Sequence, residues 1–350
     1  MRVLHVVEAM GGGVVSAVRE YVLSTAGDVE HVVLGRSRAA HDTGETLGAP
    51  LHGHLPSVRT PAAVTAAITA AVRSVRPDVV HAHSSWAGGF TRITPGVPAD
   101  RVVYTPHCYG FERTDLGRAR RAVLRRAERL LTRRTAAVAA VSPREAVLAR
   151  ALGVRLVGYV PQVVSLPDTA FARRVAELAE PGERAPRYVT AGRVCAQKDF
   201  HYFADVAREL LSSRPDAEVV WLGGGDPQDE AVLRSAGVDV RGWMDRDDLL
   251  AELAQSDVYV HTAAWEGSPM TVLEATALDL PVVARRIPSL ESIGVRGLGD
   301  DAAGVARAAE EAFKDPASLS GLDLAGTHTP TTQRTALLGL YRAVSAGARS

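Results

Sequence analysis

The sequence has few cysteines, no long apolar run and no excess of charge of either sign. Its 350 residues include two cysteines, Cys108 and Cys195, which lie far apart. This usage does not suit a disulfide framework and favours a reducing compartment. Nowhere do about 18 apolar residues follow one another, and the apolar run at the start is too short for a signal peptide. We therefore expect a cytoplasmic protein.

The charge balance gives no sign of a nucleic-acid partner. Lysine plus arginine and aspartate plus glutamate both number 40, and the formal net charge is 0. A hydrophobic content of 46% and a charged content of 23% are those of a soluble globular protein. The length suits two domains of roughly 100–200 residues each.

Strand and helix patterns alternate through the first half. Val3 to Val7 is a β-branched run, three glycines at 11–13 follow it, and a helical pattern runs over 14–23. His31 to Gly35 and Asp78 to Ser84 are further strands, and Pro61 to Val75 between them is an alanine-rich helix. This alternation predicts a parallel α/β sheet with helices on both faces. The glycine loop is not G-x-G-x-x-G, which counts against a nicotinamide enzyme.

The second half repeats this order and adds fixed cations. A strand over 188–191 ends in Gly192 and Arg193, and Lys198 follows five residues later. Arginine and lysine suit a diphosphate, because one is a planar fork and the other a mobile point charge. Another strand, over 217–222, ends in a glycine turn that contains Gly224.

The most informative segment runs from Trp265 to Ala275. A buried strand end precedes it, and a helix over 270–278 is expected to begin with Ser268 as its N-cap and Pro269 at the first helical position. The free amides of such a first turn favour a phosphate or a sugar hydroxyl. Glu266 on the turn and Glu274 in the helix can then line one cleft.

Together these motifs resemble the E-x7-E and G-R-x-x-x-x-K signatures of retaining nucleotide-sugar glycosyltransferases with the GT-B fold, specifically glycosyltransferase family 4. The resemblance implies an α/β protein with two Rossmann-like doubly wound domains facing across a cleft. An acceptor domain would span residues 1–165, with a C-terminal helix over 330–346 crossing back to it, and a donor domain would span 184–325.

The resemblance also assigns roles to residues. Glu266 would contact the transferred sugar and Glu274 the ribose, while Arg193 and Lys198 would pair with the diphosphate. His107, at the end of a strand, would lie near the donor sugar, so that the catalytic set is Glu266, His107, Arg193 and Lys198. The further donor-binding residues would be Gly12, Gly13, Gly192, Gly224, Gly242, Trp243, Gly267, Ser268, Pro269 and Met270.

We expect no metal and no cofactor. His81 and His83 share one face of a strand, but no third ligand stands at usable spacing in the sequence. Asp245 and Asp247 form a literal D-x-D, which is better interpreted as the acidic start of a helix. Cys108 beside His107 is set aside as a nucleophile, because adjacent residues at a strand end point apart.

The segment from Arg113 to Arg134 is strongly basic. One interpretation is a surface helix that packs through an apolar side. The other is a basic face, Arg118 to Arg134, on an anionic membrane. The apolar side would comprise Val123, Leu124, Ala127, Leu130 and Leu131.

The resemblance predicts a retaining, metal-independent glycosyltransferase. It would move a sugar from a nucleotide-sugar donor to a sugar, glycolipid or small-molecule acceptor, with a peripheral location at the membrane as one option. The alternatives are a GT-B-like sugar-nucleotide epimerase and a non-catalytic sugar-nucleotide-binding partner protein.

Overall fold

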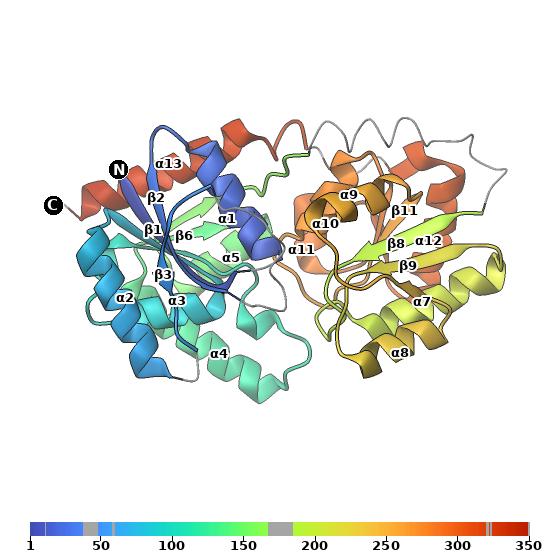
Figure 1. Ribbon diagram of the computed structural model, residues 1–350, viewed down its shortest axis with the longest axis horizontal. Helices are drawn as coiled ribbons and strands as arrows, with labels where there is room; N and C mark the ends of the chain where they lie inside the picture. The colour runs from blue at the N-terminus through green and yellow to red at the C-terminus, as the bar shows by residue number, and fades with distance from the viewer. Residues whose placement is uncertain are drawn as a thin grey trace. The chain divides into compact units, whose positions relative to one another are not determined.

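The chain divides into two compact units. The computed structural model describes residues 1–10, 12–37, 48–57, 60–166, 185–319, 322 and 324–348. The first unit comprises Met1–Val163 and Thr327–Ser350, and the second comprises Val164–Gly326. Figure 1 shows the first unit in blue to green with the red helix α13 (Pro330–Gly347), and the second in yellow-green to orange-red.

The first unit is built on a seven-stranded parallel sheet in the order β3-β2-β1-β4-β5-β6-β7. The order reverses between β1 and β4, which makes their carboxyl ends the expected place for a ligand. The strands are β1 (Arg2–Met10), β2 (Glu30–Ser37), β3 (Leu51–His54), β4 (Val79–His83), β5 (Val102–Thr105), β6 (Ala137–Ala140) and β7 (Leu156–Tyr159).

Helices cover both faces of this sheet. Its central strands are therefore buried throughout. Helix α5 (Pro143–Leu152) begins where the Ser142 side chain accepts a hydrogen bond from the Glu145 amide, with Pro143 at the first position. Leu337 and Tyr341 of α13 pack into the core of this unit. The other helices are α1 (Gly13–Ser24), α2 (Pro61–Val75), α3 (Ser84–Ile93) and α4 (Arg118–Leu131).

The second unit has a six-stranded parallel sheet in the order β10-β9-β8-β11-β12-β13, and its order reverses between β8 and β11. Its strands are β8 (Arg187–Ala191), β9 (Glu218–Leu222), β10 (Asp239–Val240), β11 (Val258–His261), β12 (Val282–Arg285) and β13 (Gly297–Gly299). Its helices are α7 (Phe200–Ser213), α8 (Pro227–Ser235), α9 (Arg246–Ala254), α10 (Met270–Ala277), α11 (Pro288–Ile293) and α12 (Ala302–Lys314).

The predicted fold class is confirmed, since both sheets are parallel and doubly wound. Asp245 is the N-cap of α9, where its side chain accepts a hydrogen bond from the Asp248 amide, as expected for a helix start. The predicted N-cap of α10 was wrong by one residue. Pro269 has extended backbone angles and is itself the cap, so the helix begins at Met270 and Ser268 caps nothing.

The interpretation of α4 as a helix packed through its apolar side is correct only in part. Leu124 packs against the core, but Val123, Ala127 and Leu130, which this interpretation also placed inward, are exposed. The buried residue of the helix is Glu128, which lies 2.9 Å from the guanidinium of the buried Arg92. Because a buried guanidinium requires a counter-charge, this pair fixes the rotation of the helix.

Candidate active site

A buried ion pair lies at the point where the strand order of the second sheet reverses. Lys198 follows β8 and Glu266 follows β11, and their Nζ and Oε1 atoms are 2.6 Å apart. The side chains are 20% and 9% exposed. Burial is the largest single effect on the pKa of Lys198 and lowers it, but the charge and hydrogen bond of Glu266, together with the neighbouring Tyr259 and Cys195, raise the pKa overall. Lys198 is therefore an ammonium ion at neutral pH.

Two further side chains surround Glu266. Gln197 donates a hydrogen bond from Nε2 to its Oε2 atom at 3.3 Å, and His261 Nε2 lies 3.8 Å from Oε1. Burial, followed by the charge of Lys198, lowers the pKa of His261 well below its usual range, so this imidazole is neutral. Sequence reasoning missed both roles. The position of His261 at the end of β11 was the available signal.

Two of the predicted glycines are required by close approach. Gly192 has a φ of 138°, and a Cβ there would lie 2.9 Å from Cε of Lys198. A Cβ at Gly224 would lie 3.0 Å from the indole ring of Trp243. Trp243 is 48% exposed and directly follows Gly242, which has a φ of 75°. Part of the Trp243 side chain is thus exposed just after β10, at the carboxyl end of the sheet.

The other two charged residues predicted for the site, Glu274 and Arg193, lie in different environments. Glu274 is 3% exposed and lies 3.1 Å from Nη2 of Arg246, a partner that sequence reasoning missed. Arg193 is exposed, and no residue that the structure describes forms an ion pair or hydrogen bond with it. Gly267, Ser268, Pro269 and Met270 form the turn into α10, and the Ser268 Oγ atom is buried with no hydrogen-bond partner among the described residues.

The first unit places its predicted residues at the carboxyl ends of β1 and β5. Gly12 is the N-cap of α1 with a φ of 64°, and Gly13 begins the helix. His107 follows β5, and both His107 and Cys108 have positive φ values, of 52° and 95°. Glu145 holds this turn, because its carboxylate accepts a hydrogen bond from the Cys108 amide at 2.8 Å. Burial raises the pKa of Glu145 to about 7.

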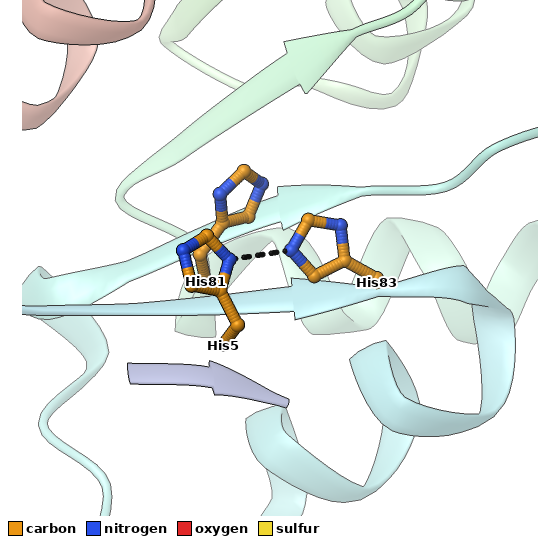
Figure 2. A group of neighbouring side chains, drawn as sticks. All are labelled: His5, His81 and His83. Carbon is orange, nitrogen blue, oxygen red and sulfur yellow. Dashed lines mark hydrogen bonds between the residues drawn. The ribbon is translucent and has the colours of Figure 1, made fainter. Parts of the chain in front are cut away.

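The structure supplies a third histidine beside His81 and His83, which corrects the statement that no further ligand is available. His5 comes from the neighbouring strand β1, and one ligand atom of each of the three residues lies within 4.8 Å of the others. Figure 2 shows the three imidazoles gathered on one face of the sheet. All three are buried. The sequence did not indicate His5 as a third ligand, because it lies 76 residues before His81 and becomes its neighbour only through the pairing of β1 with β4.

None of the described helices combines the length and apolar character that a bilayer crossing needs.

Comparison with known proteins identifies the class of enzyme. A family model described as "Glycosyl transferase 4-like domain" matches residues 12–164, and one described as "Glycosyl transferases group 1" matches residues 185–315. A UDP-Gal:alpha-D-GlcNAc-diphosphoundecaprenol alpha-1,3-galactosyltransferase of Escherichia coli is 28% identical over 229 residues. That match covers 60% of this chain and 58% of the relative.

Solved structures agree on the fold. The Anabaena protein HepE in complex with UDP-glucose is 14% identical, with a TM-score of 0.71 over 100% of this chain and 99% of that one. A Listeria monocytogenes structure named "putative UDP-N-acetylglucosamine 2-epimerase" is 13% identical, with a TM-score of 0.63 over 99% and 96% of the two chains. A structure named as an epimerase thus shares this fold, whereas both family models are described as glycosyltransferase domains. The chain is a glycosyltransferase with the GT-B fold.

Proposed function

We propose that this protein is a retaining glycosyltransferase of family 4 that moves a sugar from a nucleoside diphosphate sugar to an acceptor hydroxyl. The observation that carries the proposal is the Lys198–Glu266 pair at the carboxyl ends of β8 and β11. It joins a cation suited to a phosphate and a carboxylate suited to sugar hydroxyls at the ligand position of a doubly wound sheet. The names of the E. coli transferase and of the HepE complex both include a UDP-linked sugar.

Each group then has a role in donor binding. Arg193 and Lys198 pair with the diphosphate, and the backbone amides at the start of α10 donate further hydrogen bonds to it. The exposed face of Trp243 stacks on the base. Glu274 binds the ribose hydroxyls in an orientation set by Arg246.

The same groups stabilise the leaving diphosphate. Negative charge builds on its oxygens as the glycosidic bond breaks, and preorganised cations and amides can carry this charge without a Lewis acid. We therefore propose that turnover needs no divalent metal. Retention of anomeric configuration follows the resemblance to family 4.

Thermal shift with a panel of nucleotide sugars tests donor binding. A bound donor at about a hundredfold excess over its Kd stabilises the folded protein by about 2.7 kcal/mol. We expect this stabilisation to fall in the Arg193→Ala variant, because the free guanidinium that pairs with the diphosphate is gone. The Arg208→Ala variant is the matched control, since Arg208 is an exposed arginine of α7 paired with Asp205. An equal loss in both variants, or in neither, would remove Arg193 from the diphosphate site.

We propose further that the acceptor is lipid-linked and that α4 rests on an anionic membrane. Because Glu128 faces inward, α4 exposes apolar side chains with arginines beside them. Helices that lie at a membrane surface combine apolar and basic residues in this way. Val123 and Leu130 of α4 are 67% and 56% exposed. The name of the E. coli relative includes a diphosphoundecaprenol acceptor. The exposed residues of α4 are Arg118, Ala119, Arg120, Ala122, Val123, Arg125, Arg126, Ala127, Arg129 and Leu130.

Sedimentation with vesicles tests this surface. The wild type should bind vesicles rich in phosphatidylglycerol and lose most of this binding in high salt, because exposed charges are screened. Leu130→Ser should weaken binding, whereas Val147→Ser should not, since Val147 is equally exposed, at 56%, on α5. Binding that is absent in low salt, or unaffected by Leu130→Ser, would leave α4 as an ordinary surface helix.

A further inference from the structure

Four histidines form a diagonal row across one face of the first sheet. His31 lies on β2, His5 on β1, His83 at the end of β4, and His107 just past β5. These are four adjacent strands, and the register places each histidine two residues further toward the carboxyl end than its neighbour. Since a step of two residues keeps the same face of a strand, all four side chains are on one side.

Hydrogen bonds join the row from end to end. His31 Nδ1 lies 2.8 Å from His5 Nε2, and His5 Nδ1 lies 3.0 Å from His83 Nε2, the bond drawn in Figure 2. His83 Nδ1 lies 3.2 Å from His107 Nε2. Burial lowers the pKa of His31 to about 4 and of His107 to about 3, and those of His5 and His83 well below the usual range. At neutral pH each ring therefore has one N–H and one lone pair, so the three bonds must all point the same way.

Thr25 fixes the direction of the row. Its hydroxyl oxygen lies 2.6 Å from the carbonyl oxygen of Tyr21 and 2.8 Å from His31 Nε2. A carbonyl cannot donate, so the hydroxyl hydrogen lies between the two oxygens, and Thr25 accepts from the Nε2–H of His31. His31 Nδ1 then accepts from His5, and the same assignment passes along the row. Every histidine in it, His107 included, carries its proton on Nε2.

The outer end of the row is a ring nitrogen with a lone pair. His107 is partly exposed at the carboxyl end of β5, and none of the described residues forms a hydrogen bond with its Nδ1 atom. Its backbone is held in the left-handed region by the carboxylate of Glu145 on the following amide. The ring is thus fixed in position, in orientation and in tautomer.

We propose that His83, His5 and His31 are positioning residues that hold His107 as the Nε2–H tautomer, so that its Nδ1 atom accepts a hydrogen bond from a hydroxyl group of the sugar substrate. This role rests on the proposed transfer of a sugar from a nucleoside diphosphate sugar. The row makes His107 Nδ1 a hydrogen-bond acceptor, whereas the same nitrogen of an unconstrained imidazole could be a donor or an acceptor. Thr25, four hydrogen bonds from the outer nitrogen, thereby influences catalysis.

A metal ion bound by His5, His81 and His83 is the competing interpretation of this cluster. The hydrogen bonds of His81 argue against it. Thr105 donates its hydroxyl hydrogen to the Ala139 carbonyl and so accepts from His81 Nε2–H at 2.8 Å. His81 Nδ1 then accepts from the Tyr341 hydroxyl at 2.7 Å. Both nitrogens of all three histidines are thus already used in neutral hydrogen bonds, which a metal would have to break.

The test compares Thr25→Val with Thr25→Ser in protein labelled with 15N at histidine. Long-range 1H–15N correlation spectra report which nitrogen of His107 carries the proton, and steady-state kinetics report kcat/KM. Thr94→Val is the matched control. Thr94 is also buried and also donates its hydroxyl to a helical carbonyl, that of Phe90 at 2.7 Å, but it bonds to no histidine.

We expect the wild type and Thr25→Ser to show the Nε2–H tautomer of His107. In Thr25→Val the row loses its fixed direction, so the Nδ1–H tautomer should appear and kcat/KM should fall about twofold to tenfold, the value of one neutral hydrogen bond. Thr94→Val should change neither quantity. A proton on Nδ1 in the wild type, an unchanged tautomer in Thr25→Val, or a stoichiometric metal on the cluster would each overturn the proposal. Because the spectra need no substrate, this result is separate from any failure of the transferase assignment.

Discussion

Lowering the pH from about 7.5 to about 5.5 is expected to destabilise the first unit by about 5 kcal/mol, which is comparable with the whole folding free energy of a typical domain. The cause is a set of buried histidines whose pKa values in the folded state lie well below the usual value of 6.5. The unfolded chain binds protons as the pH falls through 6.5, and the folded chain does not. These residues are His5, His31, His81, His83 and His107.

The sign and size follow from linkage. A depressed folded pKa gives stability that is complete above the unfolded pKa and is lost as the pH falls toward the folded value. Each histidine loses about 1.4 kcal/mol over this range, or about 7 kcal/mol for the set. Glu145 acts in the opposite direction, because its pKa is raised to about 7 and it binds a proton in the folded state first. This effect offsets about 2 kcal/mol of the loss in folding stability over the same pH range.

Urea unfolding at the two pH values, followed by hydrogen exchange resolved over the first unit, measures this effect. Replacing one member of the set with a residue that does not titrate, as in His31→Gln, should reduce the pH dependence by about 1.4 kcal/mol. His52→Gln, at an exposed histidine, should leave it unchanged. A first unit that is equally stable at both pH values would show that the cluster accepts protons without cost.

Lys198→Met is expected to destabilise the second unit by about 3–5 kcal/mol, because it leaves the Glu266 carboxylate buried without its partner. The same change should weaken the binding of a nucleoside diphosphate by roughly 1.5–3 kcal/mol, the value of a charge-assisted hydrogen bond to an anion. Urea unfolding measures the first quantity and calorimetry the second.

The double variant Lys198→Met with Glu266→Gln separates the two effects. Removing both charges should restore most of the stability, because no uncompensated ion remains buried. Nucleotide affinity should stay low, since the cation is still missing. If affinity recovers together with stability, Lys198 serves the fold and not the diphosphate.

The sequence predicted the fold well because strand and helix patterns alternate along it and turn residues mark their ends. Pro61 to Val75 was predicted as a helix and forms α2 with these bounds. Local signals also found the positions of Lys198 and Glu266 after their strands. They could not give the 2.6 Å contact between these residues, which depends on β8 and β11 being neighbours.

What the sequence missed depends on contacts between distant segments. The rotation of α4 is set by Arg92, a residue 36 positions from Glu128. The pairing of Arg246 with Glu274 joins two helices in the same way. The histidine row requires the register of four strands, so no spacing within one segment indicates it. Single-segment patterns describe elements, and these features belong to the packing between elements.

The central claim is retaining sugar transfer that needs no divalent metal. Its most direct test is a single 1H NMR time course in the presence of a chelator. The wild type is mixed with the nucleotide sugar that gives the largest thermal shift and with a sugar-diphosphate lipid as acceptor. We predict equal amounts of free nucleoside diphosphate and a glycosidic product whose anomeric coupling matches that of the donor, with none of either when the acceptor is left out. Conversion of the donor to another nucleotide sugar without acceptor, an inverted anomeric centre, or a reaction abolished by the chelator would contradict the account.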